Sequence, residues 1–290
     1  MAAPAERGAA PGTDFGAEPG AGFGAEPGTD FGAEFGAALT RLLARRGLEA
    51  AELPEAAEVL ASDLRRGPGP LRRLAAVLGL HAADLFVLAG LPVPDDVAPL
   101  DATAAQWAPH LVQDGVHLPA AERGELLRAV RSFPQQERPA DDRRTTWIGV
   151  EPRGLRGPGG LRGPGGKVVR MFRRRNLGFS GPAHTMAVVT PSYLAASTYQ
   201  GIGTGRVELA PRPVVDFAAL LGVDALDQSA LTGVALPRPP PPAAPEAVGA
   251  AALLREARRL SVAQAREAAE LASALREEPR DHYRGDLPGS

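Results

Sequence analysis

Two stretches of the chain decide the fold: Leu78-Gly-Leu-His-Ala-Ala-Asp-Leu-Phe-Val-Leu-Ala-Gly90 and Leu221-Gly-Val-Asp-Ala-Leu-Asp-Gln-Ser-Ala-Leu-Thr-Gly233. They match at one constant offset, which pairs Asp84 with Asp227. Further along the chain, residues 111–133 align without a gap on residues 253–275. Self-similarity at a fixed register indicates a duplicated structural unit. We therefore expect the chain to consist of two related halves.

Apolar residues outside the low-complexity segments recur every three or four positions, which is typical of amphipathic helices. This spacing is shown by Phe35, Leu39, Leu42 and Leu43, and again by Leu71, Leu74, Ala75 and Leu78. Alternating runs of β-branched residues are nearly absent. The fold is therefore predicted to be all-α. Pro119 suits a first helical position, and Ser261 with Gln264 forms a capping box, so a helical hairpin is expected in each half.

Glycine and proline divide the chain into segments. There are 34 Gly and 29 Pro among 290 residues, and they concentrate in an N-terminal octapeptide repeat, in a tandem Leu-Arg-Gly-Pro-Gly-Gly and in a proline run. Such segments bury too little apolar surface to offset chain entropy. The predicted organisation is a disordered tail 1–33, a first helix-turn-helix domain 34–92, a hairpin 100–134, a flexible linker 135–166, a second helix-turn-helix domain 167–236, a proline-rich spacer 237–245, a second hairpin 246–278 and a flexible tail 279–290.

Composition excludes several classes of protein. The formal net charge is -2, so a uniformly basic nucleic-acid coat is absent, and the lack of cysteine excludes disulfide scaffolds, Cys-ligated metals and thiol catalysis. The longest apolar run, residues 85–89, is too short to span a bilayer, and no export signal begins the chain. We therefore expect a cytoplasmic protein without membrane contact and without a cofactor.

The five short helices expected at the start of each half resemble the lambda-repressor-like (XRE-type) helix-turn-helix domain. In the second half, residues 195–206, Ala-Ala-Ser-Thr-Tyr-Gln-Gly-Ile-Gly-Thr-Gly-Arg, are similar to the recognition helix of that family and the glycine that closes it. The resemblance implies that this helix enters the major groove of double-stranded DNA. It also implies that Ser197, Thr198 and Gln200 face the bases, while Tyr199 and Ile202 pack inward.

Charge differs between the halves. Residues 151–237 carry a net charge of +5 and residues 35–90 a net charge of +1. The candidates for phosphate contact are Lys167, Arg170, Arg173, Arg174, Arg175 and Arg206. The alternative for the cluster at 167–175 is a solvated helix face in a chain whose basic residues are 31 Arg and a single Lys.

Both halves depart from the family pattern. Residues 47–67 are shorter than in a typical member by nearly one turn, Glu58 stands at the tight-turn position, and acidic residues surround it. We therefore expect the first half to bind DNA poorly. The second half has about six additional residues before its recognition helix, which offers small side chains, so base readout through paired hydrogen bonds is expected to be weak.

The motifs that could indicate an enzyme lack the residues or the spacing that their chemistry requires. Residues 201–205 lack the full dinucleotide fingerprint, and residues 165–167 lack the other residues of a phosphate loop. The five histidines form no metal pair at helical spacing. Ser180 and His184 are one helical turn apart, but no third group completes a hydrolase site. The chain is therefore predicted not to be an enzyme.

The leading hypothesis is a DNA-binding transcriptional regulator in which the second half provides most of the affinity for double-stranded DNA. The alternative is a helical protein-interaction module whose degenerate repeats no longer bind DNA. A homodimer or another protein partner is compatible with both. The two hairpins are expected either to pair across a dimer or to pack on each other within one chain.

Overall fold

The computed structural model describes residues 31–61, 68–138, 160–178 and 181–277. Within these ranges the chain forms thirteen α-helices and two 3-10 helices and no strand, which confirms the all-α prediction. The first helix, α1, begins at Phe31 and so includes the last three residues of the predicted tail. The rest of that tail, the predicted C-terminal tail and most of the predicted linker lie outside the described residues.

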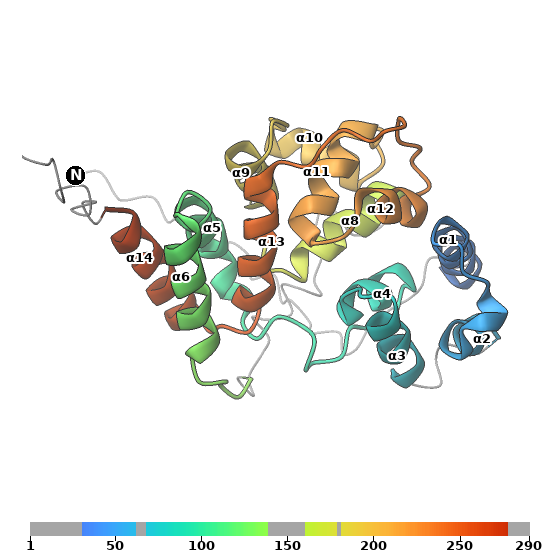
Figure 1. The fold of residues 1–290 in the computed structure, drawn as a ribbon, viewed down its shortest axis with the longest axis horizontal. Helices are drawn as coiled ribbons and strands as arrows, with labels where there is room; N and C mark the ends of the chain where they lie inside the picture. The colour runs from blue at the N-terminus through green and yellow to red at the C-terminus, as the bar shows by residue number, and fades with distance from the viewer. Residues whose placement is uncertain (1–30, 62–67, 139–159, 179–180, 278–290) are drawn as a thin grey trace, which may run out of the picture. The chain divides into compact units, whose positions relative to one another are not determined.

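The first repeat contains α1 (Phe31–Arg45), η1 (Ala50–Glu52), α2 (Pro54–Ala61), α3 (Gly69–Val77) and α4 (Ala82–Leu88) (Figure 1). Its apolar positions close one core, because every residue at the predicted helical spacing is buried: Phe35, Leu39, Leu42 and Leu43 from α1, and Leu71, Leu74, Ala75 and Leu78 from α3 and its end. Leu231 of the second half also packs in this core.

The second repeat contains α8 (Gly163–Arg173), α9 (Gly181–Val189), α10 (Ala196–Gly203), α11 (Pro211–Leu221) and α12 (Ala225–Thr232). Three rings hold its centre: Phe172 and Phe217 meet edge to face with centroids 5.4 Å apart, and Tyr199 lies 6.1 Å from Phe217 in the same geometry. Val87 of the first repeat packs into this core. Each repeat therefore places part of its last helix in the core of the other.

The predicted flexible linker 135–166 is wrong at its C-terminal end, because α8 begins at Gly163. Pro164 fits the first turn of a helix, where a backbone N–H has no helical partner. The glycines that follow allow a close approach of backbones. A Cβ at Gly165 would overlap the carbonyl oxygen of Ile202, and one at Gly203 would lie 2.9 Å from atoms of both Leu161 and Val169. The Gly-Pro-Gly-Gly sequence is thus the site where α8 packs on α10.

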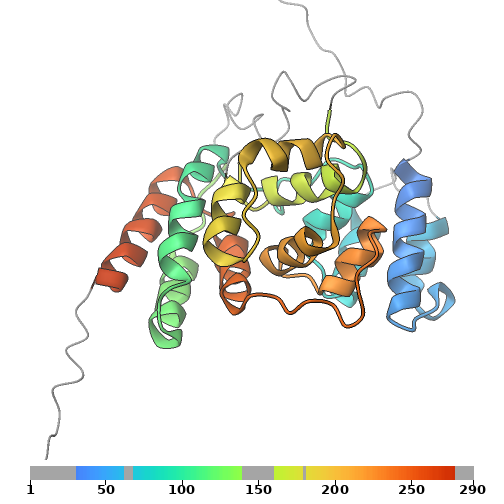
Figure 2. The ribbon, with the colours of Figure 1, turned by 90° about the horizontal axis from the view of Figure 1, so that it is seen from above.

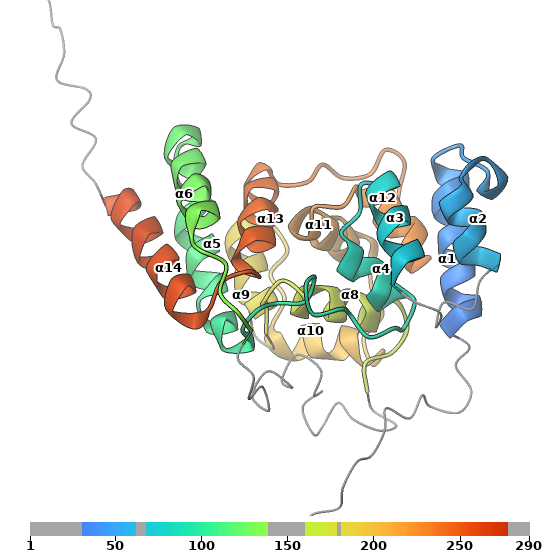
Figure 3. The same ribbon diagram turned by 90° about the horizontal axis from the view of Figure 1, so that it is seen from below.

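The two hairpins pack on each other within one chain, which settles the choice left open by the sequence. The first hairpin has η3 (Ala102–Gln106), α5 (Ala108–Gly115) and α6 (Ala120–Ser132), and the second has α13 (Pro245–Ala257) and α14 (Val262–Glu277). Figures 2 and 3 show these four α-helices side by side. Leu111, Leu126, Leu253 and Ala268 contribute to their common core, and ion pairs join Arg131 to Glu256 and Arg276 to Asp114.

The starts of three hairpin helices confirm one predicted detail and correct two. The Ser261 N–H donates to Gln264 Oε1 at 3.1 Å and the Gln264 N–H donates to Ser261 Oγ at 3.4 Å, so the capping box is present. Pro119 is the N-cap residue of α6 and not its first helical residue. Pro245, predicted to end the proline-rich spacer, is instead the first residue of α13, where its fixed φ suits a helix start.

Candidate nucleic-acid interface

The predicted recognition helix is α10. Tyr199 and Ile202 are buried on its inner side, each 3% exposed, as expected for side chains that pack inward. On the other side Ser197 is exposed, and Thr198 and Gln200 are half-buried. The N-cap residue, Ala195, offers no side chain to the first amides of the helix. The first turn of α10 therefore keeps backbone N–H groups available for an anion.

Arginines lie beside α10, because α8 packs on it. Near the C-terminal end, the Arg162 N–H donates to the Gly203 carbonyl at 2.9 Å, and Arg206 Nε donates to Thr204 Oγ1 at 3.2 Å. Both arginines are exposed. Near the middle of α10, Arg173 and Gln200 line the same small depression between α8 and α10. The structure thus brings Arg173 and Arg206 of the predicted set next to α10 and adds Arg162, which the sequence analysis had not selected.

Three of the predicted phosphate contacts bind other groups of the protein. Arg175 is 3% exposed, and its guanidinium is paired with Asp84, so its selection as a surface cation is wrong. Lys167 is 9% exposed, and its ammonium lies 3.0 Å from Glu34 of α1. Arg170 is half-buried and donates to the Leu161 carbonyl at 2.7 Å. Helix geometry explains the division, because consecutive residues of α8 face different directions.

Arg174 lies in a strongly positive environment. Burial lowers the pKa of its guanidinium to about 10, and repulsion from Arg173, Arg138 and Arg170 adds to the effect. Arg174 takes part in no ion pair with a described residue.

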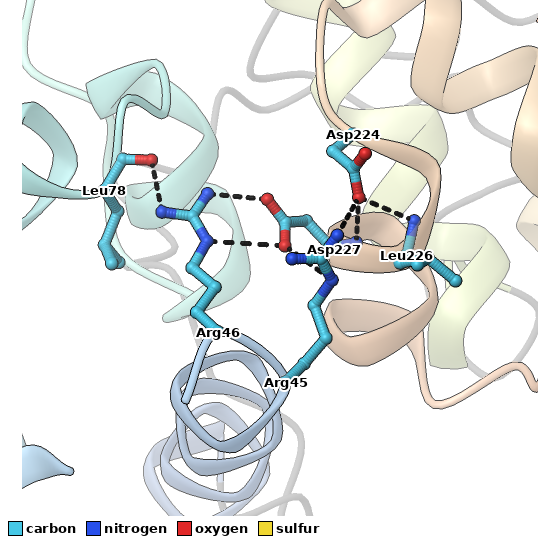
Figure 4. A network of polar contacts seen from close by, with 6 residues as sticks. All are labelled: Arg45, Arg46, Leu78, Asp224, Leu226 and Asp227. Carbon is cyan, nitrogen blue, oxygen red and sulfur yellow. Dashed lines mark hydrogen bonds and ion pairs between the residues drawn. The ribbon is translucent and has the colours of Figure 1, made fainter. Parts of the chain in front are cut away.

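The two repeats contact each other reciprocally. Arg46, at the end of α1, donates to Asp227 of α12 at 2.6 Å and to the Leu78 carbonyl of its own repeat at 2.9 Å (Figure 4). Arg175, just after α8, donates to Asp84 of α4 at 2.6 Å and to the Leu221 carbonyl of its own repeat at 3.1 Å. Asp84 and Leu78 match Asp227 and Leu221 in the duplication. The contact is thus repeated with the roles of the repeats exchanged, as around a two-fold axis.

Helix ends confirm this correspondence. Gly79 and Gly222 both have positive φ, at 60° and 69°, and both end their helices with hydrogen bonds of the same pattern. Gly47 and Asn176, with φ of 67° and 55°, do the same after the first helix of each repeat. Arg45-Arg46-Gly47-Leu48 therefore corresponds to Arg174-Arg175-Asn176-Leu177. That short similarity was visible in the sequence and would have suggested that Arg46 and Arg175 share a role.

The first repeat lacks the predicted turn at Glu58. Glu58 lies inside α2 and pairs with Arg73 of α3 at 2.5 Å, so its assignment to a tight turn is wrong. Proline is favoured in the first turn of a helix, so α2 begins at Pro54. Glu58 therefore lies in the second turn of this helix. The segment expected to carry the rest of the recognition helix, 62–67, lies outside the described residues. Glu49, Glu52 and Glu58 are exposed, so the described part of this face is acidic.

Among the described residues, the candidate catalytic and metal-binding side chains do not come together as an enzyme site. His184 Nε2 lies 3.0 Å from the Gln113 side-chain oxygen, and Ser180 lies outside the described residues. No group of three or more His, Asp or Glu side chains that could hold a metal ion occurs in the described ranges. In the same ranges, no helix combines the length and the apolar character that crossing a bilayer requires.

Comparison with known proteins gives no relative for this chain: no family model, no curated protein and no solved structure matches it.

Proposed function

We propose that the second repeat binds double-stranded DNA through α10 and the arginines beside it, and that the protein acts as a transcriptional regulator. The observation that carries the proposal is the position of the cations: Arg162 and Arg206 lie at the C-terminal end of α10, and Arg173 lines a depression with Gln200, near the middle of the helix. Arginines along a groove-binding helix suit the phosphates that border a groove.

Each part of this surface has a separate role. Ser197, Thr198 and Gln200 face the bases, and the backbone N–H groups of the first turn of α10 donate hydrogen bonds to a phosphate of the DNA backbone. Arg162, Arg173 and Arg206 provide affinity that does not depend on sequence. Gln200 ends in an amide whose NH2 donor and oxygen acceptor are separate atoms and can bind one base edge together, whereas Ser197 and Thr198 each end in a single hydroxyl, so we expect Gln200 to contribute most of the base discrimination.

The acidic face of the first repeat favours a second role for that repeat. Glu49 and Glu52 are exposed and would repel phosphate, while Glu58 is already paired with Arg73, so we propose that the first repeat contacts a protein while the second binds DNA. If the second repeat also failed to bind DNA, the whole chain would be a protein-interaction module.

The test is selection of duplexes from a randomised pool by the full chain, followed by affinity measurements on the selected sequence over a range of salt concentrations. Arg162→Ala and Arg206→Ala should each weaken binding to every sequence and reduce the slope of log K against log salt by about one. Gln200→Ala should relax the preference at one base pair.

The matched control is Arg128→Ala, which removes an exposed arginine from α6 in the hairpin region. It should leave DNA affinity unchanged. Failure to enrich any sequence, together with equal binding by the wild type and the Arg162 and Arg206 variants, would overturn the proposal.

A further inference from the structure

We propose that the DNA recognised by this protein is a single half-site without inverted symmetry, and that one chain, without a second copy, binds it. The inference rests on the proposed function, because α10 is the helix assigned there to the bases, and it adds the form of the DNA site. Two helix-turn-helix domains related by a two-fold axis read two inverted half-sites about 10 base pairs apart. In this protein the two domains related in that way belong to one chain.

The two-fold contact uses, within one chain, the surfaces through which two copies would pair. Arg46 of the first repeat binds Asp227 of the second at 2.6 Å (Figure 4), and Arg175 of the second repeat binds Asp84 of the first at 2.6 Å. Both aspartates are buried, with exposed fractions of 1% and 3%. The last helix of each repeat also places an apolar side chain in the core of the other. A second copy would have to break these buried contacts in order to pair in the same way.

The hairpins are closed to a second copy for a similar reason. Their apolar faces form one core within the chain, in which Leu126 of α6 and Ala268 of α14 are fully buried. No helix in the described ranges carries more than one exposed large apolar side chain. These exposed side chains are Leu60 of α2, Val77 of α3, Val248 of α13, and Tyr193 and Val207 in the loops before and after α10. Since stable interfaces between copies have a continuous apolar core, no described helix offers a face for one.

The stretch that carries α10 is much shorter in the first repeat. In the second repeat the 37 residues 174–210 separate α8 from α11 and form both α9 and α10. In the first repeat the 23 residues 46–68 separate α1 from α3, and their described part contains one α-helix, α2. Glu49 and Glu52 in this stretch are exposed, and carboxylates repel phosphate. The two repeats therefore differ in the element that would read a second half-site.

The chain thus joins one repeat that reads DNA to one that does not, through a contact that is itself two-fold symmetric. Its DNA-binding face has no two-fold symmetry, because α10 occurs once. One bound chain therefore reads one half-site. An inverted second half-site should serve only as an independent position for another chain.

The experiment uses the full chain and the sequence that it selects from a randomised pool of duplexes. That sequence should lack an inverted repeat at a spacing of about 10 base pairs, and native mass spectrometry should find one chain per duplex. Adding an inverted second half-site about 10 base pairs away should raise the apparent affinity by at most about twofold, without cooperativity. Two reading helices joined in a dimer would raise it by about a hundredfold or more.

Gln200→Ala gives a separate measure of the symmetry. With one α10 in the complex, this variant should relax the base preference at one position of the selected sequence. With two copies in the complex, it would relax the preference at two positions related by inversion. Arg128→Ala, which changes an exposed residue of α6, is the matched control and should alter neither the selected sequence nor the mass of the complex.

The outcomes separate this inference from the proposed function. Selection of a palindromic sequence, or two chains in each complex, would overturn the single half-site and leave DNA binding by α10 in place. Failure to select any sequence would overturn the proposed function and this inference together. One chain on an asymmetric sequence, with one position affected by Gln200→Ala, is the result expected if both are correct.

Discussion

Arg175 and Asp84 form a buried ion pair between the two repeats, with both guanidinium nitrogens 2.6 Å from the two carboxylate oxygens. Arg46 and Asp227 repeat this contact in the opposite direction. Each arginine follows the first helix of one repeat, and each aspartate lies in the last helix of the other. The duplicated halves are therefore joined as the two subunits of a symmetric dimer would be, but within a single chain.

Asp84→Asn should destabilise the protein by about 3–5 kcal/mol, because it leaves the guanidinium of Arg175 buried without a counter-charge. Denaturant unfolding of the full chain measures the change. Asp96→Asn is the control, since Asp96 makes a similar two-bond pair with Arg72 at the surface. It should cost about 1 kcal/mol or less. Equal costs for the two variants would show that burial of the Arg175 pair has no energetic consequence.

Gly165→Ala should destabilise the protein by about 1–3 kcal/mol, because a Cβ at this position overlaps the backbone of Ile202 and pushes α8 away from α10. Gly124→Ala in α6 is the matched change, and its Cβ would meet only the end of the Arg128 side chain at 3.6 Å. That variant should gain up to about 1 kcal/mol from helix propensity. Thermal or denaturant unfolding separates the two, and a stabilised Gly165→Ala would contradict the close packing of α8 on α10.

The sequence predicted the helices and the duplication because both depend on local patterns. The spacing of Leu71, Leu74 and Leu78 determines a buried face, and the glycines at 79 and 222 end helices in both halves whatever lies around them. The pairing of the hairpins was left open, since the same apolar faces can pack within a chain or between chains. Only the positions of the other elements decide between these arrangements.

The candidate site was less predictable, because a run of charged residues in a sequence does not show which way each side chain points. Lys167 and Arg173–Arg175 form one basic run, yet Arg175 is buried against Asp84, Lys167 pairs with Glu34, and Arg173 borders α10. The contacts of Arg175 and Lys167 join segments more than 90 residues apart in the sequence. The glycine-rich start of α8 was misjudged for a related reason: glycine weakens an isolated helix, but here it permits contact with α10.

Ser261→Ala should cost about 1 kcal/mol, because it removes the side-chain acceptor for the Gln264 N–H at the start of α14. Ser273→Ala, in the body of the same helix, should be close to neutral, since alanine is the better helix former and the Ser273 hydroxyl makes only a 3.5 Å contact with Glu277. Urea unfolding of the two variants provides the comparison. A cost at Ser273 equal to that at Ser261 would argue against capping.

His81 should make the stability of the protein depend on pH. Its pKa of about 4 in the folded chain lies below the value of about 6.5 expected when unfolded, so the unfolded chain takes up the proton first as the pH falls. The contribution is complete above pH 7 and is lost as the pH falls toward 4. Between pH 7.5 and pH 5 it should lower the free energy of unfolding by about 2 kcal/mol.

His81→Asn should remove this part of the pH dependence while keeping an acceptor for the Ala83 N–H, which His81 Nδ1 binds at 3.2 Å. Denaturant unfolding at several pH values gives the difference between the two proteins. Parallel curves would mean that the imidazole is not held neutral beside Arg175.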